Sequence, residues 1–104
     1  MTRSINVQEA AARQKLGSVI IDVREVDEFN AISAPDTINV PLSIIQKIGK
    51  EAFRNVGVNP ESDGLLMICR SGGRSAMACS ILGDNAINVE GGMLAWEAAG
   101  LPIR

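Results

Sequence analysis

The residues best suited to chemistry stand in one short segment, positions 69–75, which read CRSGGRS. Cys69 ends an apolar run, and a helix-like stretch begins near Ser75. Two adjacent glycines allow the backbone to curl so that successive N–H groups point inward and bind an anion. The start of a helix adds unpaired N–H groups, and Arg70 and Arg74 add two full positive charges. Thiols in such surroundings have a pKa of about 3.5–7.5, so we predict that Cys69 is a nucleophilic thiolate near neutral pH.

The two cysteines have different alternatives. Cys69 has the blander interpretation of a small buried residue that finishes a strand. The glycines and arginines that follow it favour the chemical role. Cys79 lies in the middle of an apolar helical stretch, where we expect it to be a packing residue. We expect no disulfide between them, because the end of a strand and a site farther along a helix lie more than about 7 Å apart.

Composition limits the classes of function. The chain has 104 residues, which predicts a single domain over residues 1–104. It contains no histidine, so His-activated nucleophiles and His-ligated zinc are excluded, and we expect no metal and no cofactor. A net charge of −2 and the absence of tyrosine argue against a nucleic-acid interface. No apolar run has the length of a signal region or a membrane span. We therefore expect a soluble protein of a reducing compartment, the cytoplasm.

Short apolar runs alternate with helix-like segments along the chain. The pair Asn6 and Glu9 predicts a helix N-terminus, and Ser43 with Gln46 predicts a second one, with Ile45, Ile48, Ala52 and Val56 on one face and Gly49 as an interruption. The predicted helices span about residues 7–15, 26–31, 43–56, 75–82 and 93–99, and the predicted strands 19–21, 38–41, 64–69 and 86–89. This alternation predicts an α/β fold, a small parallel sheet with helices on both faces.

In such a sheet, ligands bind where the carboxyl ends of the strands meet. That rule points to residues 69–75 and to the turn that begins with Asp22. We interpret Asp22 as structural support that accepts hydrogen bonds from neighbouring backbone. Arg24 either adds to the positive rim of the site, as a substrate-binding residue, or pairs with Glu25 or Glu28.

Four segments together resemble the rhodanese (sulfurtransferase) family, over nearly the whole chain. They are VIIDVREVDEF at 19–29, INVP at 38–41, CRSGGRS at 69–75, and Gly91-Gly92 with Trp96 and Gly100-Leu101-Pro102. One stretch departs from the family pattern: residues 33–37 read SAPDT, where the family commonly has His-Ile-x-Gly-Ala. Independently of the resemblance, the residue pattern predicts that Trp96 is a core residue and that Gly91-Gly92 form a turn at the start of the last helix.

The resemblance implies a doubly wound fold around a five-stranded parallel sheet, and a persulfide intermediate on Cys69. In that mechanism the thiolate takes the outer sulfur of an anionic donor such as thiosulfate, and a thiol, cyanide or a partner protein's cysteine accepts it. Arg70 and Arg74 bind the anion. The N–H groups of Ser71, Gly72, Gly73 and Ser75 hold the transferred sulfur, while the Ser75 hydroxyl either adds a donor or caps the helix.

Two other functions compete with sulfur transfer. One is a non-catalytic rhodanese-like module for sulfur relay or regulatory docking. The other is a thiolate phosphatase or arsenate reductase, which also combines a cysteine, a backbone cradle and an arginine. Phosphatase-like sites have five residues between Cys and Arg, whereas only four stand between Cys69 and Arg74, so Ser75 occupies the place of their arginine. This count favours sulfur over phosphate esters.

Overall fold

The computed structural model describes residues 3–104, and within them the chain forms one five-stranded, fully parallel sheet in the order β1-β5-β4-β2-β3. The predicted α/β fold with a five-stranded parallel sheet is thus confirmed. The strands are β1 (Arg3–Ile5), β2 (Ile20–Asp22), β3 (Ile38–Asn39), β4 (Leu65–Ile68) and β5 (Ala86–Val89). The helices are α1 (Val7–Lys15), α2 (Val26–Ala31), α3 (Leu42–Ile48), α4 (Glu51–Arg54), α5 (Gly73–Leu82) and α6 (Gly92–Ala98).

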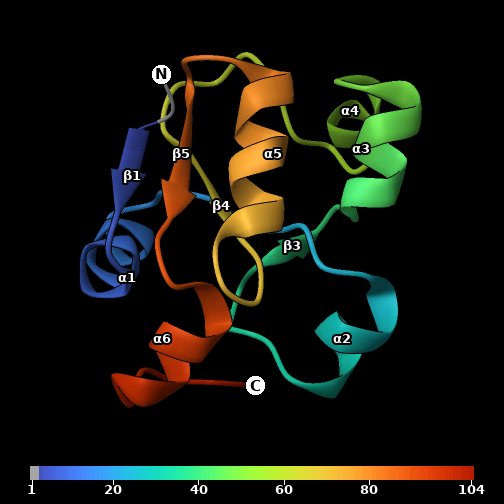
Figure 1. The fold of residues 1–104 in the computed structure, drawn as a ribbon. Coiled ribbons are helices and arrows are strands. Elements are labelled where there is room, and N and C mark those ends of the chain that lie inside the picture. The colour runs from blue at the N-terminus through green and yellow to red at the C-terminus, as the bar shows by residue number, and fades with distance from the viewer. Residues whose placement is uncertain (1–2) are drawn as a thin grey trace.

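The central strands are buried on both faces, and successive residues alternate between two apolar cores. Along β4, Leu65 and Met67 pack under α3, α4 and α5, whereas Leu66 and Ile68 pack under α1 and α6. Figure 1 shows α5 lying along the sheet, and α1 and α6 lying near each other at one side of it. Trp96 is fully buried in the second core, which confirms its predicted packing role. The two cores hold β4 rigidly, and β4 carries Cys69 at its end.

Strand β1 is the element that the residue pattern does not predict. It has only three residues, two of them exposed, at the edge of the sheet beside β5. A short edge strand carries little hydrophobic signal, so nothing in its composition separates it from a loop. The Asn6 cap that follows it is confirmed, since its side chain accepts the Glu9 N–H at 2.9 Å.

The cap predicted at Ser43 is wrong. Helix α3 begins one residue earlier, at Leu42, directly after Pro41. The Ser43 hydroxyl donates instead to the Glu25 carboxylate at 2.8 Å, and the Gln46 amide donates a hydrogen bond to the Met77 sulfur. The predicted interruption at Gly49 is confirmed, because its φ of +61° ends α3 before α4 begins. Ile48 and Val56 are exposed, so the predicted apolar face keeps only Ile45 and Ala52.

The stretch at 33–37 forms a turn in spite of its unusual sequence. Asp36, where the family commonly has glycine, has φ +59°, the one positive φ outside glycine among the described residues. Asp tolerates this left-handed conformation better than most residues. The turn is tied down by Thr37, whose hydroxyl donates to the Ala34 carbonyl, and by Gln14 of α1, whose amide donates to the Pro35 carbonyl.

Candidate active site

The sulfur of Cys69 lies at the carboxyl end of β4, under the loop that leads into α5. The Gly72 N–H donates to this sulfur at 3.1 Å, and the Ser75 hydroxyl oxygen lies 3.3 Å from it. Cys69 is only 1% exposed, and Ser75 is wholly buried. The structure therefore brings the predicted nucleophile together with Gly72 and Ser75 of the predicted binding segment.

The loop takes this shape because of its glycines. Gly72 has φ +113°, a conformation that residues with a Cβ rarely adopt, and it stands as the N-cap of α5. Helix α5 consequently begins at Gly73, two residues before the predicted start, and Ser75 lies inside its first turn. The start of this helix points its free N–H groups toward the end of β4, where Cys69 lies.

Helix α6 supports the same loop from the other side. The Met93 N–H donates to the Cys69 carbonyl at 2.8 Å, and the Leu94 N–H donates to the Arg70 carbonyl at 3.0 Å. A Cβ on Gly92 would lie 2.3 Å from the Cys69 carbonyl oxygen, so only glycine permits this approach. The glycine pair predicted as a turn does open the last helix, and it also fixes the backbone of the nucleophile. With those carbonyls held by α6, neighbouring N–H groups face the sulfur.

Burial and hydrogen bonding act in opposite directions on Cys69. Burial raises the pKa of its thiol, but hydrogen bonds from the Ser75 hydroxyl and from the N–H groups of Ser75, Gly72 and Ser71 outweigh it, so the pKa is lowered. Cys79 has only the burial, which raises the pKa of its thiol to about 12. Both thiols are free, and the expected absence of a disulfide agrees with this. Cys79 lies on the buried face of α5 and packs in the core, as predicted.

The two arginines of the loop differ in their surroundings. The Arg74 guanidinium makes two hydrogen bonds to Glu28 of α2, at 2.6 and 2.8 Å. This pairing lowers the pKa of Glu28 to about 2 and raises that of Arg74. Arg70 is exposed and, within residues 3–104, has no ion-pair partner. Arg70 is thus the loop cation available to a small anion, whereas Arg74 is already occupied.

Arg24 does not lie on the rim of the site. Its guanidinium is buried against the Asp22 carboxylate at 2.7 Å, and it also donates to the Ile32 carbonyl at 2.7 Å. The partners considered from sequence, Glu25 and Glu28, are replaced by Asp22, which is fully buried and next to β4 in the sheet. Asp22 also accepts the Arg24 N–H at 3.0 Å, the kind of backbone bond expected of it. This ion pair stabilises the turn after β2. Because Asp22 neutralises the charge of Arg24, that charge does not serve the Cys69 site.

Two side chains at the site were not singled out from sequence. Glu28 was named only as an alternative partner of Arg24, and Asn88 only as part of a strand. The Asn88 oxygen lies 2.5 Å from the Ser75 hydroxyl, and its amide N–H donates to the Gly72 carbonyl at 3.3 Å. A polar residue in an otherwise apolar, fully buried strand is the signal that points to Asn88.

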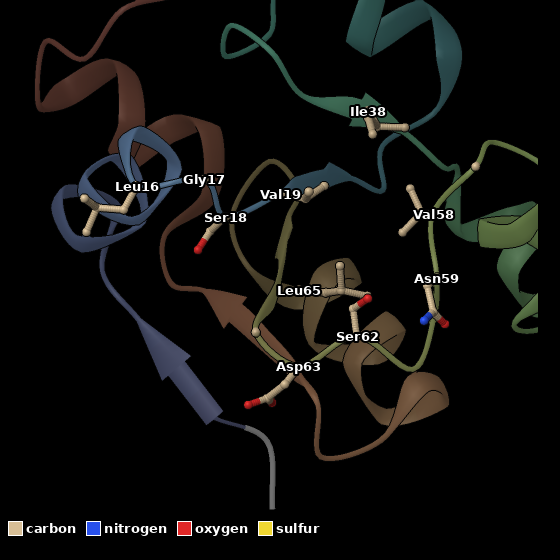
Figure 2. A pocket seen from close by; sticks show the side chains of 12 residues that line it. Leu16, Gly17, Ser18, Val19, Ile38, Val58, Asn59, Ser62, Asp63 and Leu65 are labelled. Carbon is tan, nitrogen blue, oxygen red and sulfur yellow. The ribbon is translucent and has the colours of Figure 1, made fainter.

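A hollow of about 670 Å³ lies at the end of the sheet opposite to Cys69, where β2, β3 and β4 begin (Figure 2). Its lining includes Leu16, Val19, Val58 and Leu65, and its acidic residue, Asp63, is exposed and paired with Arg3. In residues 3–104, no buried side-chain nitrogen or oxygen lacks a hydrogen-bond partner. That part of the chain also has no helix long and apolar enough to cross a membrane.

Comparisons with known proteins agree with this geometry. Residues 6–99 match the model of the rhodanese-like domain. A sulfurtransferase of Allochromatium vinosum is 30% identical over 89 residues, which cover 82% of this chain and 77% of that protein. YrkF of Bacillus subtilis, whose name proposes a sulfur carrier, is 33% identical over 81 residues, 74% of this chain but only 40% of that protein.

Among solved structures, a rhodanese-related protein of Thermoplasma volcanium superposes with a TM-score of 0.79 at 31% identity, over 98% of this chain and 97% of the other. The chain belongs to the rhodanese-like sulfurtransferase family.

Proposed function

We propose that this protein moves a sulfane sulfur from thiosulfate or a similar anionic donor to a thiophilic acceptor, through a persulfide on Cys69. The observation that carries the proposal is that the backbone N–H groups of Ser71, Gly72 and Ser75 are directed at the Cys69 sulfur, with the Gly72 nitrogen 3.1 Å from it. Such donors favour an anionic sulfur in a protein that has no histidine to serve as a base. The same donors stabilise a persulfide anion.

In the first half-reaction, the Cys69 thiolate attacks the outer sulfur of the donor. A new S–S bond forms, the bond between the two donor sulfurs breaks, and sulfite leaves with its electron pair. Sulfite needs no proton to depart, so no general acid is required. Cys69 then carries one additional sulfur, and the N–H groups of Ser71 to Ser75 are placed to hold it.

In the second half-reaction, a nucleophile attacks the outer sulfur of the persulfide. Cyanide, a small thiol or a partner protein's cysteine serves as the acceptor. The persulfide S–S bond breaks, and its electron pair returns to Cys69 as the thiolate. The network that lowers the thiol pKa also makes Cys69 a good leaving group in this step.

Arg70 is our candidate for binding the sulfonate end of the donor, because it is exposed and adjacent to Cys69. Arg74 contributes by pairing with Glu28, which ties α2 to the first turn of α5. Since Cys69 is 1% exposed, the sulfane sulfur reaches it only when the loop of residues 70–73 shifts outward. Three of these four loop residues are exposed, and Gly72 is partly exposed, which makes the loop the movable part of the site.

The test is intact mass spectrometry after treatment with thiosulfate, followed by cyanide. We expect one added sulfur, its loss when cyanide is supplied, and thiocyanate in solution. Cys79→Ser should behave as the unmodified protein does, whereas Cys69→Ser should gain no sulfur. Failure of Cys69 to gain sulfur from thiosulfate, polysulfide and other persulfides alike would refute the proposal.

A sulfur carrier is the second candidate, favoured by the resemblance to YrkF. A carrier loads one sulfur and passes it to a specific protein, with slow turnover to small acceptors. Steady-state thiocyanate production separates the two, because a carrier gives one equivalent and an enzyme gives many.

Phosphate esters are disfavoured as substrates by two features of the loop. Ser75, which stands where phosphatase-like sites have arginine, is buried against Cys69, and Arg74 is held by Glu28. The remaining loop guanidinium, Arg70, directly follows Cys69 and does not stand where the phosphatase arginine binds the equatorial oxygens. Hydrolysis of an aryl phosphate, measured on the same preparation, should fall far below thiosulfate:cyanide turnover, and the reverse ranking would favour the phosphatase.

A further inference from the structure

Asn88 is a buried amide in the middle of the sheet, 7% exposed, on a strand whose other residues are apolar. Its side chain reaches the loop after β4, where it contacts Ser75 and Gly72. Sulfur transfer as described above does not use it. A buried amide costs free energy unless its hydrogen bonds are made, so its partners define its role.

Four polar groups form a closed circuit around the sulfur of Cys69. The Gly72 N–H lies 3.1 Å from the sulfur, and the sulfur lies 3.3 Å from the Ser75 hydroxyl oxygen. That oxygen lies 2.5 Å from the Asn88 carbonyl oxygen, and the Asn88 amide nitrogen lies 3.3 Å from the Gly72 carbonyl. The Ser75 hydroxyl oxygen also lies 3.2 Å from the Gly72 carbonyl oxygen, a longer contact than the one to Asn88.

A count of protons gives the circuit a direction. The Ser75 hydroxyl has a single proton. The Asn88 orientation is fixed because its N–H faces the Gly72 carbonyl, so its oxygen faces Ser75 and takes that proton. The Ser75 lone pairs then face the sulfur, which suits an S–H that donates to Ser75. A neutral thiol completes the circuit. The hydroxyl can donate to a thiolate only by turning away from Asn88, so its lowering effect on the pKa of Cys69 is opposed by the loss of the bond to Asn88.

We propose that Asn88 is a positioning residue that holds the Ser75 hydroxyl proton away from the Cys69 sulfur and so limits how readily Cys69 ionises. The 2.5 Å contact between the Ser75 and Asn88 oxygens supports this assignment, because an amide oxygen can only accept, and two oxygens this close need the hydroxyl proton between them. The other donors to the sulfur are backbone N–H groups, which cannot turn away from it without a movement of the loop itself. The Ser75 hydroxyl is the donor that can rotate, and Asn88 controls it.

The charged groups around Cys69 do not replace this control. On α5 and α2 they are Arg74 and Glu28, which pair with each other. At the end of β2, beside β4, is Asp22, which pairs with Arg24 in the turn that follows. Arg70 follows Cys69 and is exposed, and the turn between β5 and α6 carries the exposed Glu90. Substitution of Asn88 leaves all of these contacts in place.

The control has a chemical use. The intrinsic nucleophilicity of a thiolate falls as its pKa falls, so the best attacking thiol has a pKa near the ambient pH. If several N–H groups and a free hydroxyl all donated hydrogen bonds to the anion, the thiolate would be stable but weakly nucleophilic. Asn88 withdraws the hydroxyl and keeps the thiolate reactive.

The experiment measures the rate of Cys69 alkylation by iodoacetamide against pH, read by intact mass, in Asn88→Ala and Asn88→Leu. Alanine cannot clash, and leucine retains the volume. We expect the pKa of Cys69 to fall by about one unit in both, the size of a released hydrogen bond to an anion. Asn85→Ala is the matched control, since Asn85 bonds the Pro60 and Ser62 carbonyls at the far end of β5 and should leave that pKa unchanged.

The double variants decide the mechanism. In Ser75→Ala, substitution of Asn88 should have no further effect on the pKa of Cys69, because there is no hydroxyl to release. Ser75→Ala alone should shift that pKa by less than about half a unit, which tests the proposal even if the Asn88 variants do not fold. A rise of a unit or more in Ser75→Ala would overturn the proposal. So would an unchanged or raised pKa in the Asn88 variants, or an equal fall without Ser75. The alkylation readout is independent of any sulfur donor, so failure of the proposed function would not affect it.

Discussion

Cys69 and Cys79 form a natural comparison within one molecule. They lie ten positions apart, before and within α5, and are 1% and 2% exposed in the same apolar core. The pKa of Cys79 is raised to about 12 by burial alone, whereas the pKa of Cys69 is lowered in spite of burial. Burial therefore does not distinguish a reactive cysteine from a packing one. The direction of a few N–H and O–H groups does.

The largest effect expected from this difference is on sulfur transfer. Cys69→Ser removes the nucleophile, so thiocyanate production from thiosulfate and cyanide should be lost completely. Cys79→Ser should retain it, at some cost in stability from a hydroxyl in an apolar core. Equal losses in the two variants, with both folded by circular dichroism, would erase the distinction between the cysteines.

The next effect is on alkylation of the native protein. The pKa of the Cys69 thiol is below the usual 9.0, whereas that of the Cys79 thiol is about 12. At a given pH, the ratio of thiolate to thiol is therefore more than about a thousandfold higher for Cys69 than for Cys79. At neutral pH, iodoacetamide should label one cysteine, and peptide mapping should place the label on Cys69. Unfolding in guanidinium should expose both. Comparable labelling of both cysteines in the folded state would contradict the contrast.

Cys79 should also make the fold sensitive to alkali. Its pKa is about 12 in the folded state and near the usual 9.0 in an unfolded chain, so between these values the unfolded state loses a proton that the folded state keeps. The free energy of unfolding should fall there with a slope of up to about 1.4 kcal/mol per pH unit from this thiol. Cys79→Ala should reduce the slope, as measured by urea unfolding from pH 8 upward. Cys69 acts with the opposite sign, since its lowered pKa stabilises the fold as pH rises toward the unfolded value.

Much of the site could be predicted from sequence because its signals are local. The glycines after Cys69 predict a loop with inward N–H groups, and Gly72 has the left-handed φ that such a loop requires. The contrast between Cys69 and Cys79 follows from their neighbours along the chain. The start of α5 differs from the prediction by two residues because Gly72, rather than Ser75, caps the helix, whereas its end at Leu82 is as predicted.

Which side chains pair with each other across the fold could not be predicted from the sequence. Arg74 meets Glu28, which is 46 positions away, and Asn88 meets Ser75 across two elements. Such contacts depend on which strands are neighbours, and the order β5-β4-β2 has crossovers that no local pattern encodes. The residue types were visible in the sequence, while their partners were set by topology. This is why Arg74 reads as an anion ligand in the sequence and lies in an ion pair in the structure.

The smallest expected effect tests that ion pair through Cys69. Glu28→Gln leaves the Arg74 charge uncompensated, so the pKa of Cys69 should fall by a few tenths of a unit, whereas Arg74→Ala should raise it by a similar amount. The effect is small because both side chains are about a third exposed, at 35% for Arg74 and 31% for Glu28, and are therefore screened by solvent. The double variant should return close to the unmodified value, and added salt should shrink every shift. Glu28→Gln should also remove a stabilisation that is present above pH 4.5 and lost as the pH falls toward the Glu28 pKa of about 2. If Glu28→Gln raised the pKa of Cys69, Arg74 would be acting on the sulfur through geometry, and the charge argument would be wrong.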